Sequence, residues 1–261
     1  MRYAILRCLH SNGGLVMIAE SDDGYEEIVT QINEAASLAA MREIAVSICK
    51  AYHLANIAYH ALYIPGAKMF SPILVLTYDA DWIARYIDNN YFKIDPVVVS
   101  GTKSFLPLDW ARLDRDNVVA RDFFKEADRF NVGRQGITLP VRGTGGERAL
   151  FTITANMSAS EWDQRRVGYM REFQMIAHYM HDRIAELSGY RGGKPKTALS
   201  PREMTCLESA ARGATAKQIA ASLGITDRAV RLFLTSGCAK LDCVTIPQAV
   251  AKTVSLEMLR P

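Results

Sequence analysis

The chain has 261 residues, of which 49% are hydrophobic and 23% are charged, and its formal net charge is +3. This balance is typical of a globular protein with room for two domains, and it excludes a disordered chain or a fibrous repeat. The five cysteines are scattered and include no Cys-x-x-Cys pair. We therefore expect no disulfide framework, no zinc knuckle and a cytoplasmic location. No apolar run is long enough for a membrane span or a signal peptide, so we expect neither.

A short segment rich in glycine and positive charge divides the chain. Residues 188–197 hold three glycines, one proline and three cations, a composition typical of a linker. Residues 196–261 carry nine Lys and Arg against five Asp and Glu, whereas the other 195 residues carry 22 against 23. All the positive excess therefore lies in the last quarter of the chain. We predict an N-terminal extension at 1–20, a large domain at 21–187, the linker at 188–197 and a small domain at 198–261.

The large domain alternates between helical and strand periodicity. The predicted elements are, in order, a helical stretch at 23–50, strands at 57–63 and 72–78, helices at 81–89 and 116–130, strands at 137–141 and 149–155, and a helix at 160–187 that Ser160 caps. The strands at 137–141 and 149–155 are expected to pair as a hairpin across the glycine-rich turn at 142–146. Helices that flank a mostly antiparallel sheet predict an α+β fold with α/β/α layers. The last helix has more apolar residues than one core face needs, so we predict that part of it is a dimer contact.

Capping signals divide the small domain into four short helices, which makes it all-α. Ser200, Thr215, Thr226 and Thr245 each stand at a predicted helix start. Gly224 supplies a tight turn between the second and third helices, and two helices that meet at such a turn are typical of a DNA-binding helix-turn-helix. A small helical bundle without a DNA partner is the alternative.

The basic side chains of the small domain favour the DNA-binding interpretation. Arg228 and Arg231 lie in the first turns of the third helix, the part that enters a major groove, and Thr226 caps that helix. Lys217 and Lys240 lie where phosphate contacts are expected. We therefore predict these five residues as the DNA-binding set.

Several motifs of the small domain are shared with a known family. They are Leu199-Ser200-Pro201-Arg202-Glu203, Thr215-Ala216-Lys217-Gln218-Ile219-Ala220, Leu223-Gly224-Ile225 and Lys240-Leu241. Over some sixty residues the segment resembles the C-terminal domain of the LuxR family of transcriptional regulators. The recognition helix departs from that family at Ala229 and Phe233, where threonine and histidine are usual, and Ile246-Pro247 replaces an Asn-Arg-x stretch. These departures leave the fold intact but change the expected DNA preference.

The large domain also has motifs that are shared with a known family. They are the segment from Tyr78 to Tyr86, Asp95-Pro96-Val97-Val98, Trp110 and Gly136-Ile137-Thr138-Leu139-Pro140. On these residues the domain resembles the autoinducer-binding domain of quorum-sensing LuxR proteins. A phosphoreceiver domain, which many regulators with this type of small domain carry, is excluded because its acidic pair and its strand-end aspartate are missing.

An N-acyl-homoserine lactone donates one amide N–H, accepts at two carbonyls and has an aliphatic tail, so its pocket needs an acceptor, donors and an apolar tunnel. The resemblance implies that Asp95 accepts from the ligand amide and that Trp82 donates to the lactone carbonyl. It also implies that Tyr78 and Thr152 hydrogen-bond the amide carbonyl, while Tyr86 and Trp110 line the tail and lactone. Taken singly, the aromatic residues are more typical of a core, and their joint spacing favours the ligand site. We expect the ligand-free domain to be poorly stable, because Asp95 would be buried without a partner.

The two resemblances together predict a homodimeric regulator that binds the lactone and promoter DNA, contacts RNA polymerase and requires no cofactor or metal. A ligand-independent or lactone-repressed regulator of the same fold remains the alternative. A lactone-processing enzyme is disfavoured because the chain has neither a G-x-S-x-G elbow nor a cluster of metal ligands. We expect the His178 and His181 pair to be structural or to lie at the surface.

Overall fold

The computed structural model describes residues 22–64, 73–114, 117–143, 146–189, 198–256 and 258–259. The predicted N-terminal extension lies outside these ranges, and so does most of the predicted linker. In the described part of the chain, no helix is both long and apolar enough to cross a membrane.

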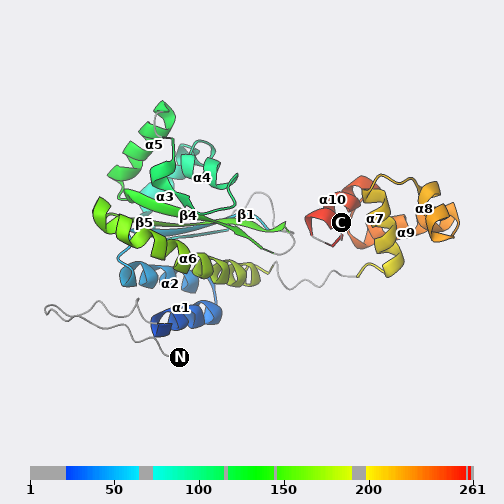
Figure 1. Cartoon of the computed structure of the whole chain (residues 1–261), viewed down its shortest axis with the longest axis horizontal. Helices are drawn as coiled ribbons and strands as arrows, with labels where there is room; N and C mark the ends of the chain where they lie inside the picture. Colours follow the sequence, from blue (N-terminus) through cyan, green and yellow to red (C-terminus); the bar gives the residue numbers. More distant parts are fainter. Residues whose placement is uncertain are drawn as a thin grey trace, which may run out of the picture.

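A five-stranded antiparallel sheet forms the centre of the large domain (Figure 1). Its strands are β1 Asn56–Tyr63, β2 Leu74–Leu76, β3 Leu108–Asp109, β4 Gln135–Arg142 and β5 Arg148–Ala155, in the order β2-β1-β5-β4-β3. β4 and β5 form the predicted hairpin. Because side chains alternate between the two faces of a strand, each strand contributes to two different layers.

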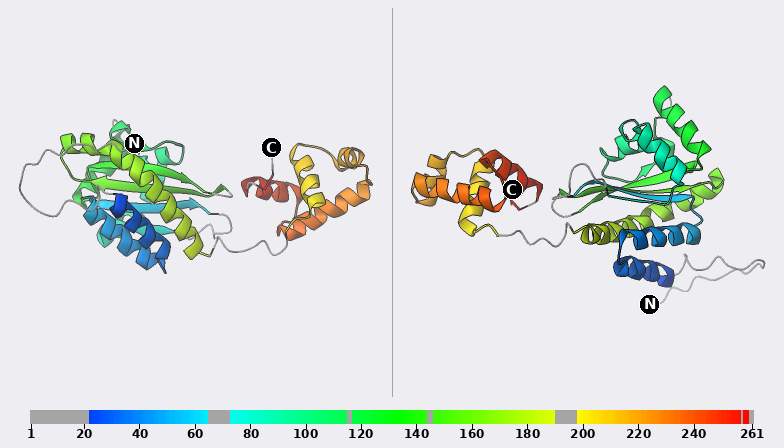
Figure 2. Two further views of the ribbon diagram at one scale, coloured as in Figure 1. Left: turned by 60° about the horizontal axis from the view of Figure 1, so that its bottom comes forward. Right: turned by 180° about the vertical axis from the view of Figure 1, so that it is seen from behind.

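Three helices cover one face of this sheet (Figures 1 and 2). They are α1 Asp22–Glu34, α2 Leu38–Ala51 and α6 Ala159–Leu187, and α1 lies outside α2 and α6. The main core fills this layer and includes Tyr59, Phe151 and Phe173, all fully buried. α6 contacts β4, α1 and α2. Most of its apolar residues are therefore used inside the domain, and of those predicted for a dimer contact only Val167 and Met175 are at least half exposed.

Short helices cover the opposite face. They are α3 Ala80–Asp88, η1 Tyr91–Lys93, α4 Pro96–Gly101, η2 Trp110–Arg112 and α5 Val118–Arg129. A second, mainly aromatic core that includes Trp82, Trp110 and Phe123 lies in this layer. The predicted α+β fold with α/β/α layers is confirmed, although periodicity did not reveal η1, α4, η2 and β3 because each is only two to six residues long.

Two predicted helix boundaries are wrong. The helical stretch predicted at 23–50 is two helices, because α2 starts afresh at its N-cap Ser37, whose Oγ accepts the Ala40 amide at 3.1 Å. The apolar spacing continues across the break since Ala35 belongs to the same core, so periodicity alone conceals it. The long helix is capped by Ser158 and not by Ser160, in a reciprocal capping box with Glu161.

The small domain contains four described helices: α7 Pro201–Ala211, α8 Ala216–Leu223, α9 Asp227–Lys240 and α10 Ile246–Ser255. The predicted N-caps Ser200, Thr215, Thr226 and Thr245 are all confirmed. α8 ends at Gly224, whose φ of 63° is the left-handed conformation that glycine adopts at little cost. The helices share a small core around Leu207, Val230 and Leu234.

Candidate functional site

A cavity of about 290 Å³ lies in the large domain between the sheet and the short helices. Its floor is the face of the sheet opposite the main core, where Ala58, Leu76, Leu150 and Thr152 line it. Its walls come mainly from α3, η1, α4 and α5 and are mostly apolar or aromatic. All six predicted ligand-binding residues line this one cavity: Tyr78, Trp82, Tyr86, Asp95, Trp110 and Thr152. A small apolar or amphipathic molecule is the type of ligand that such a cavity accepts.

Asp95 is the acidic residue of the cavity and also the N-cap of α4. Its Oδ1 accepts the Val97 amide at 2.8 Å, and its Oδ2 accepts the Tyr86 hydroxyl at 2.9 Å. Burial raises the pKa of Asp95 to about 6, although these hydrogen bonds favour the ionised form. The expectation that this carboxylate lacks a partner in the ligand-free protein is therefore wrong. It is partnered by neutral donors, and a further N–H donor would favour its ionised form.

Trp82 and Tyr78 contribute polar groups to the wall of the cavity. Trp82 lies on α3 and is 3% exposed, with ring contacts to Tyr86, Tyr91 and Phe123. Within the described residues, no acceptor takes its indole N–H, so this donor is available to a ligand. Burial and the nearby Asp95 raise the pKa of the Tyr78 hydroxyl, which keeps the phenol protonated and able to donate.

A chain of side-chain hydrogen bonds crosses the floor of the cavity. The Trp110 indole N–H donates to Thr138 Oγ1 at 3.0 Å, and Thr138 Oγ1 lies 2.9 Å from Thr152 Oγ1. Trp110 lines the cavity as predicted, but its N–H is already used inside the protein. Gly136 makes this packing possible, because a Cβ at that position would lie 2.5 Å from the Trp110 ring.

Sequence reasoning missed three polar residues of this region, one of which, Asn90, precedes η1 and lines the cavity. Thr138 lies directly opposite Thr152 in the register of the β4–β5 hairpin. The length of the predicted hairpin turn was the signal that could have found it, because the turn sets this register. His60 lines the cavity from β1, and its place in an otherwise apolar strand was the signal.

A cluster of three polar side chains, centred on Glu126, links the helices above the cavity. Glu126 on α5 accepts a hydrogen bond from Arg85 Nε of α3 at 2.6 Å and another from the Tyr91 hydroxyl of η1. These contacts join α5 to α3 and η1, two elements that lie well before it in the chain. Arg85 is half exposed, so the ion pair itself contributes little free energy and its role is mainly one of geometry.

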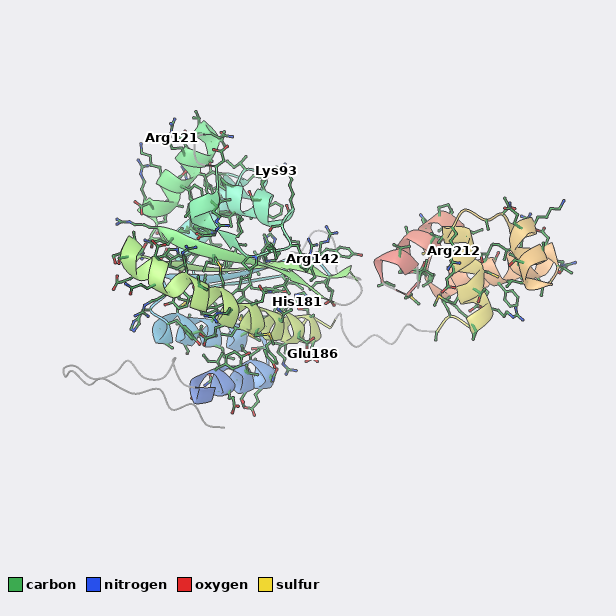
Figure 3. All side chains as sticks on the ribbon, in the orientation of Figure 1. Lys93, Arg121, Arg142, His181, Glu186 and Arg212 are labelled. Atoms are coloured by element: carbon green, nitrogen blue, oxygen red, sulfur yellow. The ribbon has the colours of Figure 1, made fainter. Side chains whose placement is uncertain are left out.

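The two predicted histidines do not form a metal site. His181 on α6, labelled in Figure 3, is 2% exposed and lies between the Tyr59 hydroxyl at 2.8 Å and Glu147 Oε2 at 3.0 Å. His178 is exposed, and its Nδ1 lies 2.6 Å from the Gln174 carbonyl. Among the described residues, no group of three or more His, Cys, Asp or Glu side chains could hold a metal ion. The structure therefore gives His181 a buried structural position.

The exposed face of α9 is the candidate DNA-reading surface. Arg228 and Arg231 lie on it, and Arg231 Nε pairs with Asp227 Oδ2 at 2.8 Å across one turn. Leu232, 63% exposed, and Thr235 continue the same face. Neither was predicted, although their spacing from Arg228 is helical. Arginine, threonine and an apolar side chain together can read base edges and thymine methyl groups in a major groove.

The other predicted DNA-binding residues have different surroundings. Lys217 is exposed on the first turn of α8. The Thr226 hydroxyl accepts the Ala229 amide at 3.2 Å as the N-cap of α9. Lys240 Nζ lies 2.8 Å from Glu203 Oε2 and 3.3 Å from the Ala198 carbonyl. Lys240 thus holds α9 against α7, a role within the domain that the prediction of a phosphate contact did not include.

The departure of Phe233 from the family pattern has a structural explanation. Its side chain is partly buried and packs against the core of the small domain. A histidine in that position would bring a polar ring to the same apolar contact. The substitution therefore adds to the core and leaves the exposed face of α9 to Arg228, Arg231, Leu232 and Thr235.

A cavity lined by aromatic side chains and a buried acid, in a chain that also has a helix-turn-helix, defines a regulator that binds a small molecule and DNA. Residues 37–184 match the autoinducer-binding domain, and residues 197–253 match the bacterial regulatory proteins of the luxR family. The chain belongs to the LuxR family of autoinducer-binding transcriptional regulators.

Individual relatives agree with this assignment. The chain is 48% identical to the transcriptional activator protein RaiR of Rhizobium etli over 194 residues, which cover 74% of this chain and 80% of that protein. It is 28% identical to the transcriptional activator protein VanR of Vibrio anguillarum, over 73% and 78% of the two chains. The crystal structure of SdiA from Escherichia coli shares the fold, with a TM-score of 0.63 at 16% identity over 91% and 98% of the two chains. A structure titled as SdiA in complex with octanoyl-rac-glycerol has a TM-score of 0.62 at 16% identity, over 91% and 96% of the two chains.

Proposed function

We propose that this protein is a homodimeric transcriptional regulator that responds to an N-acyl-homoserine lactone. The observation that carries the proposal is the position of Asp95 and the Trp82 indole in one cavity. Asp95 is a buried acceptor and the Trp82 indole N–H has no acceptor among the described residues. The lactone supplies the complementary pair, an amide N–H and carbonyl oxygens.

The remaining lining supports the same ligand. Tyr78 and Thr152 would bind the amide carbonyl, while Tyr86 orients the Asp95 carboxylate through its hydroxyl. Trp110 presents its ring to the ligand, since its N–H is bonded to Thr138. The apolar walls would hold the acyl chain, and such a ligand is uncharged, which suits a cavity whose acid already has neutral donors.

The small domain would then bind promoter DNA. Arg228 and Arg231 would contact bases from α9, with Thr226 at its start, and Lys217 would contact a phosphate. Lys240 would support α9 through Glu203 and retains little freedom to reach a phosphate. A dimer would present two such helices to two half-sites. A relative of 48% identity is named a transcriptional activator, which supports activation through contact with RNA polymerase in the bacterial cytoplasm.

The binding test uses the full-length chain. Octanoyl-homoserine lactone, at about 100 times its dissociation constant, should stabilise the protein by about 2.7 kcal/mol, visible as a higher melting temperature. Octanoyl-rac-glycerol is the comparison probe, because it carries the same acyl chain without the amide and the lactone. Stabilisation by lactones of several chain lengths supports the proposal, and stabilisation by the acylglycerol alone contradicts it.

The response of DNA binding is measured next, by gel shift on a selected operator with and without the lactone. Stronger binding with lactone supports activation by the signal. Weaker binding identifies a lactone-repressed regulator, and unchanged binding identifies a ligand-independent one. Chromatography of the mixture shows whether the lactone is hydrolysed, which is the result expected of an enzyme.

A further inference from the structure

His60 places a polar ring in the part of the cavity that would hold the acyl chain. It lies on β1, faces the cavity beside Ala58, and is bordered on the neighbouring strands by Leu74 and Leu150. Its partners across the two neighbouring strands, Leu74 and Leu150, and the ring that it contacts, Phe92, are all hydrocarbon. A pocket that served only for a plain acyl chain would gain more from leucine at this position.

The imidazole of His60 has no hydrogen-bond partner among the residues that the structure describes. Its ring contact is with Phe92, at a centroid separation of 5.0 Å and in an edge-to-face arrangement. Burial lowers the pKa of His60 to about 4, so the ring is neutral near pH 7. A neutral imidazole has one N–H donor and one nitrogen acceptor, and both are free for a ligand.

The strand register gives the distance of His60 from the amide end of the ligand. Ala58 on β1 is the direct partner of Thr152 on β5, and His60 is two residues further along β1 on the same face. Such a diagonal pair is separated by about 7–8 Å, and the imidazole ring spans part of that distance. A ligand whose amide carbonyl meets Thr152 would therefore bring the first carbons of its acyl chain near the ring.

We propose that His60 is a specificity-determining residue that selects acyl chains with an oxygen substituent close to the amide, a hydroxyl or a keto group. This inference rests on the proposed function, because it assumes that the ligand is an acyl-homoserine lactone. A plain chain removes water from the imidazole and offers no hydrogen bond in return, which costs binding free energy. An oxygen atom on the chain restores that hydrogen bond.

The test compares three probes of equal length: octanoyl-, 3-oxooctanoyl- and 3-hydroxyoctanoyl-homoserine lactone. Their affinities are measured with the full-length chain, and each variant is judged by the ratio of its affinities for the oxygenated and plain probes. This ratio does not depend on how much of a variant folds. We expect the unaltered chain to favour an oxygenated probe by about tenfold.

His60→Leu should remove this preference or reverse it, whereas His60→Gln, which keeps a donor and an acceptor, should retain most of it. Leu62→Met is the control, since Leu62 is also on β1 but is not part of the cavity lining, and should keep the original ratio. Equal affinities in the unaltered chain, or an unchanged ratio in His60→Leu, overturn the inference and leave the proposed function standing. A failure of all three lactones to bind overturns both.

Discussion

At the scale of single residues, Asp95 combines a structural role with the ligand-binding role that we propose for it. Its carboxylate caps α4 and accepts the Tyr86 hydroxyl, yet burial raises its pKa from 3.8 to about 6. Ionised Asp95 therefore opposes folding in the absence of ligand. Its contribution to stability is fully present below about pH 3.8 and is lost as the pH rises through about 6. The proposed binding acid therefore lowers the stability of the ligand-free protein at neutral pH.

We predict that Asp95→Asn raises the free energy of unfolding of the ligand-free protein at neutral pH. The gain is at most about 3 kcal/mol, from the difference between the two pKa values. Asparagine is an equally good N-cap, so α4 should keep its start. The same variant should lose the stabilisation by lactone, because the charged acceptor is gone. Urea unfolding with and without the lactone measures both effects.

The control for this experiment is Asp79→Asn. Asp79 caps α3 in the same way, with a 2.8 Å contact to the Asp81 amide, but it is exposed. Its replacement should leave stability and lactone response nearly unchanged. The advantage of Asp95→Asn should shrink as the pH falls from about 7 toward 4, since the native aspartate then becomes protonated. A variant that is less stable than the unaltered chain at neutral pH would falsify this account of Asp95.

Thr138→Val tests the hydrogen-bond chain on the cavity floor. It removes the acceptor of the Trp110 indole, which is 4% exposed, and leaves a buried donor unpaired. We expect a loss of about 1–3 kcal/mol in unfolding free energy. Combining it with Trp110→Phe should cost less than the sum of the two single changes, because both break the same contact. If the losses of unfolding free energy from the two single changes simply add in the double variant, the Trp110 indole and Thr138 are not energetically coupled and this account of the cavity floor is wrong.

The sequence allowed some of these residues to be predicted and concealed others. Asp95 and Trp82 could be predicted because they lie in short local motifs shared with a family. Thr138 also lies in a shared motif, but that motif assigns it no contact, and its pairing with Thr152 could be found only by counting outward from the predicted hairpin turn, since it depends on strand register. Lys240 was predicted as a phosphate contact because its charge is visible in the sequence. Its partner Glu203 is 37 residues away and is visible only in the fold.

At the scale of elements, local capping signals predicted helix starts better than apolar periodicity did. In the small domain, all four predicted N-caps are confirmed, because a serine or threonine precedes each helix. In the large domain, the helix break before Ser37 was missed because buried side chains on both sides share one core. Elements such as α4 and η2, with six and three residues, are too short for a periodic pattern to repeat. Their positions are set by Asp95 and Asp109, which cap them.

The contact between α7 and α9 leads to a prediction about two lysines. Burial alone would raise the pKa of Glu203, but hydrogen bonds from Lys240, Ser236 and Ser200 outweigh it and hold the pKa at about 2. Lys240→Met should therefore lower the stability of the small domain by about 1–3 kcal/mol. Lys217→Met should leave stability unchanged and reduce the salt dependence of DNA binding by about one phosphate contact.

Two measurements separate these roles: thermal unfolding, and the slope of log affinity for DNA against log salt. The stability that Glu203 provides is present above its unfolded pKa of 4.5 and is lost as the pH falls toward 2. The Lys240→Met variant should lose the part of this acid-sensitive component that Lys240 supplies, while the hydrogen bonds from Ser236 and Ser200 remain. If instead it keeps full stability and shows the shallower salt slope, Lys240 contacts phosphate as the sequence first indicated.

At the scale of the whole molecule, the net charge of +3 divides into a basic small domain and a nearly neutral remainder. The basic part suits a polyanionic partner, and the cavity of the large domain suits an uncharged one. A signal bound in the large domain can control DNA binding only by shifting an equilibrium between two states of the protein for which its affinity differs, such as unfolded and folded or monomer and dimer. Dimer formation is the step we propose.

The dimer makes a geometric prediction about the operator. Two recognition helices related by a twofold axis need half-sites on the same side of the DNA, about one helical turn or a multiple apart. An operator is first selected from random DNA with the full-length protein and lactone. Inserting about five base pairs between its half-sites places them on opposite sides of the duplex, which should weaken binding by about 100-fold or more through the loss of simultaneous contact.

An insertion of about ten base pairs restores the rotational alignment and is the matched control, and it should recover part of the affinity. The insertions leave every base contact of a single half-site intact, so a change in affinity reports on the pairing of the two small domains and not on recognition by α9. If the half-turn insertion binds as tightly as the original operator, each small domain binds alone and the lactone must act by a route other than dimerisation.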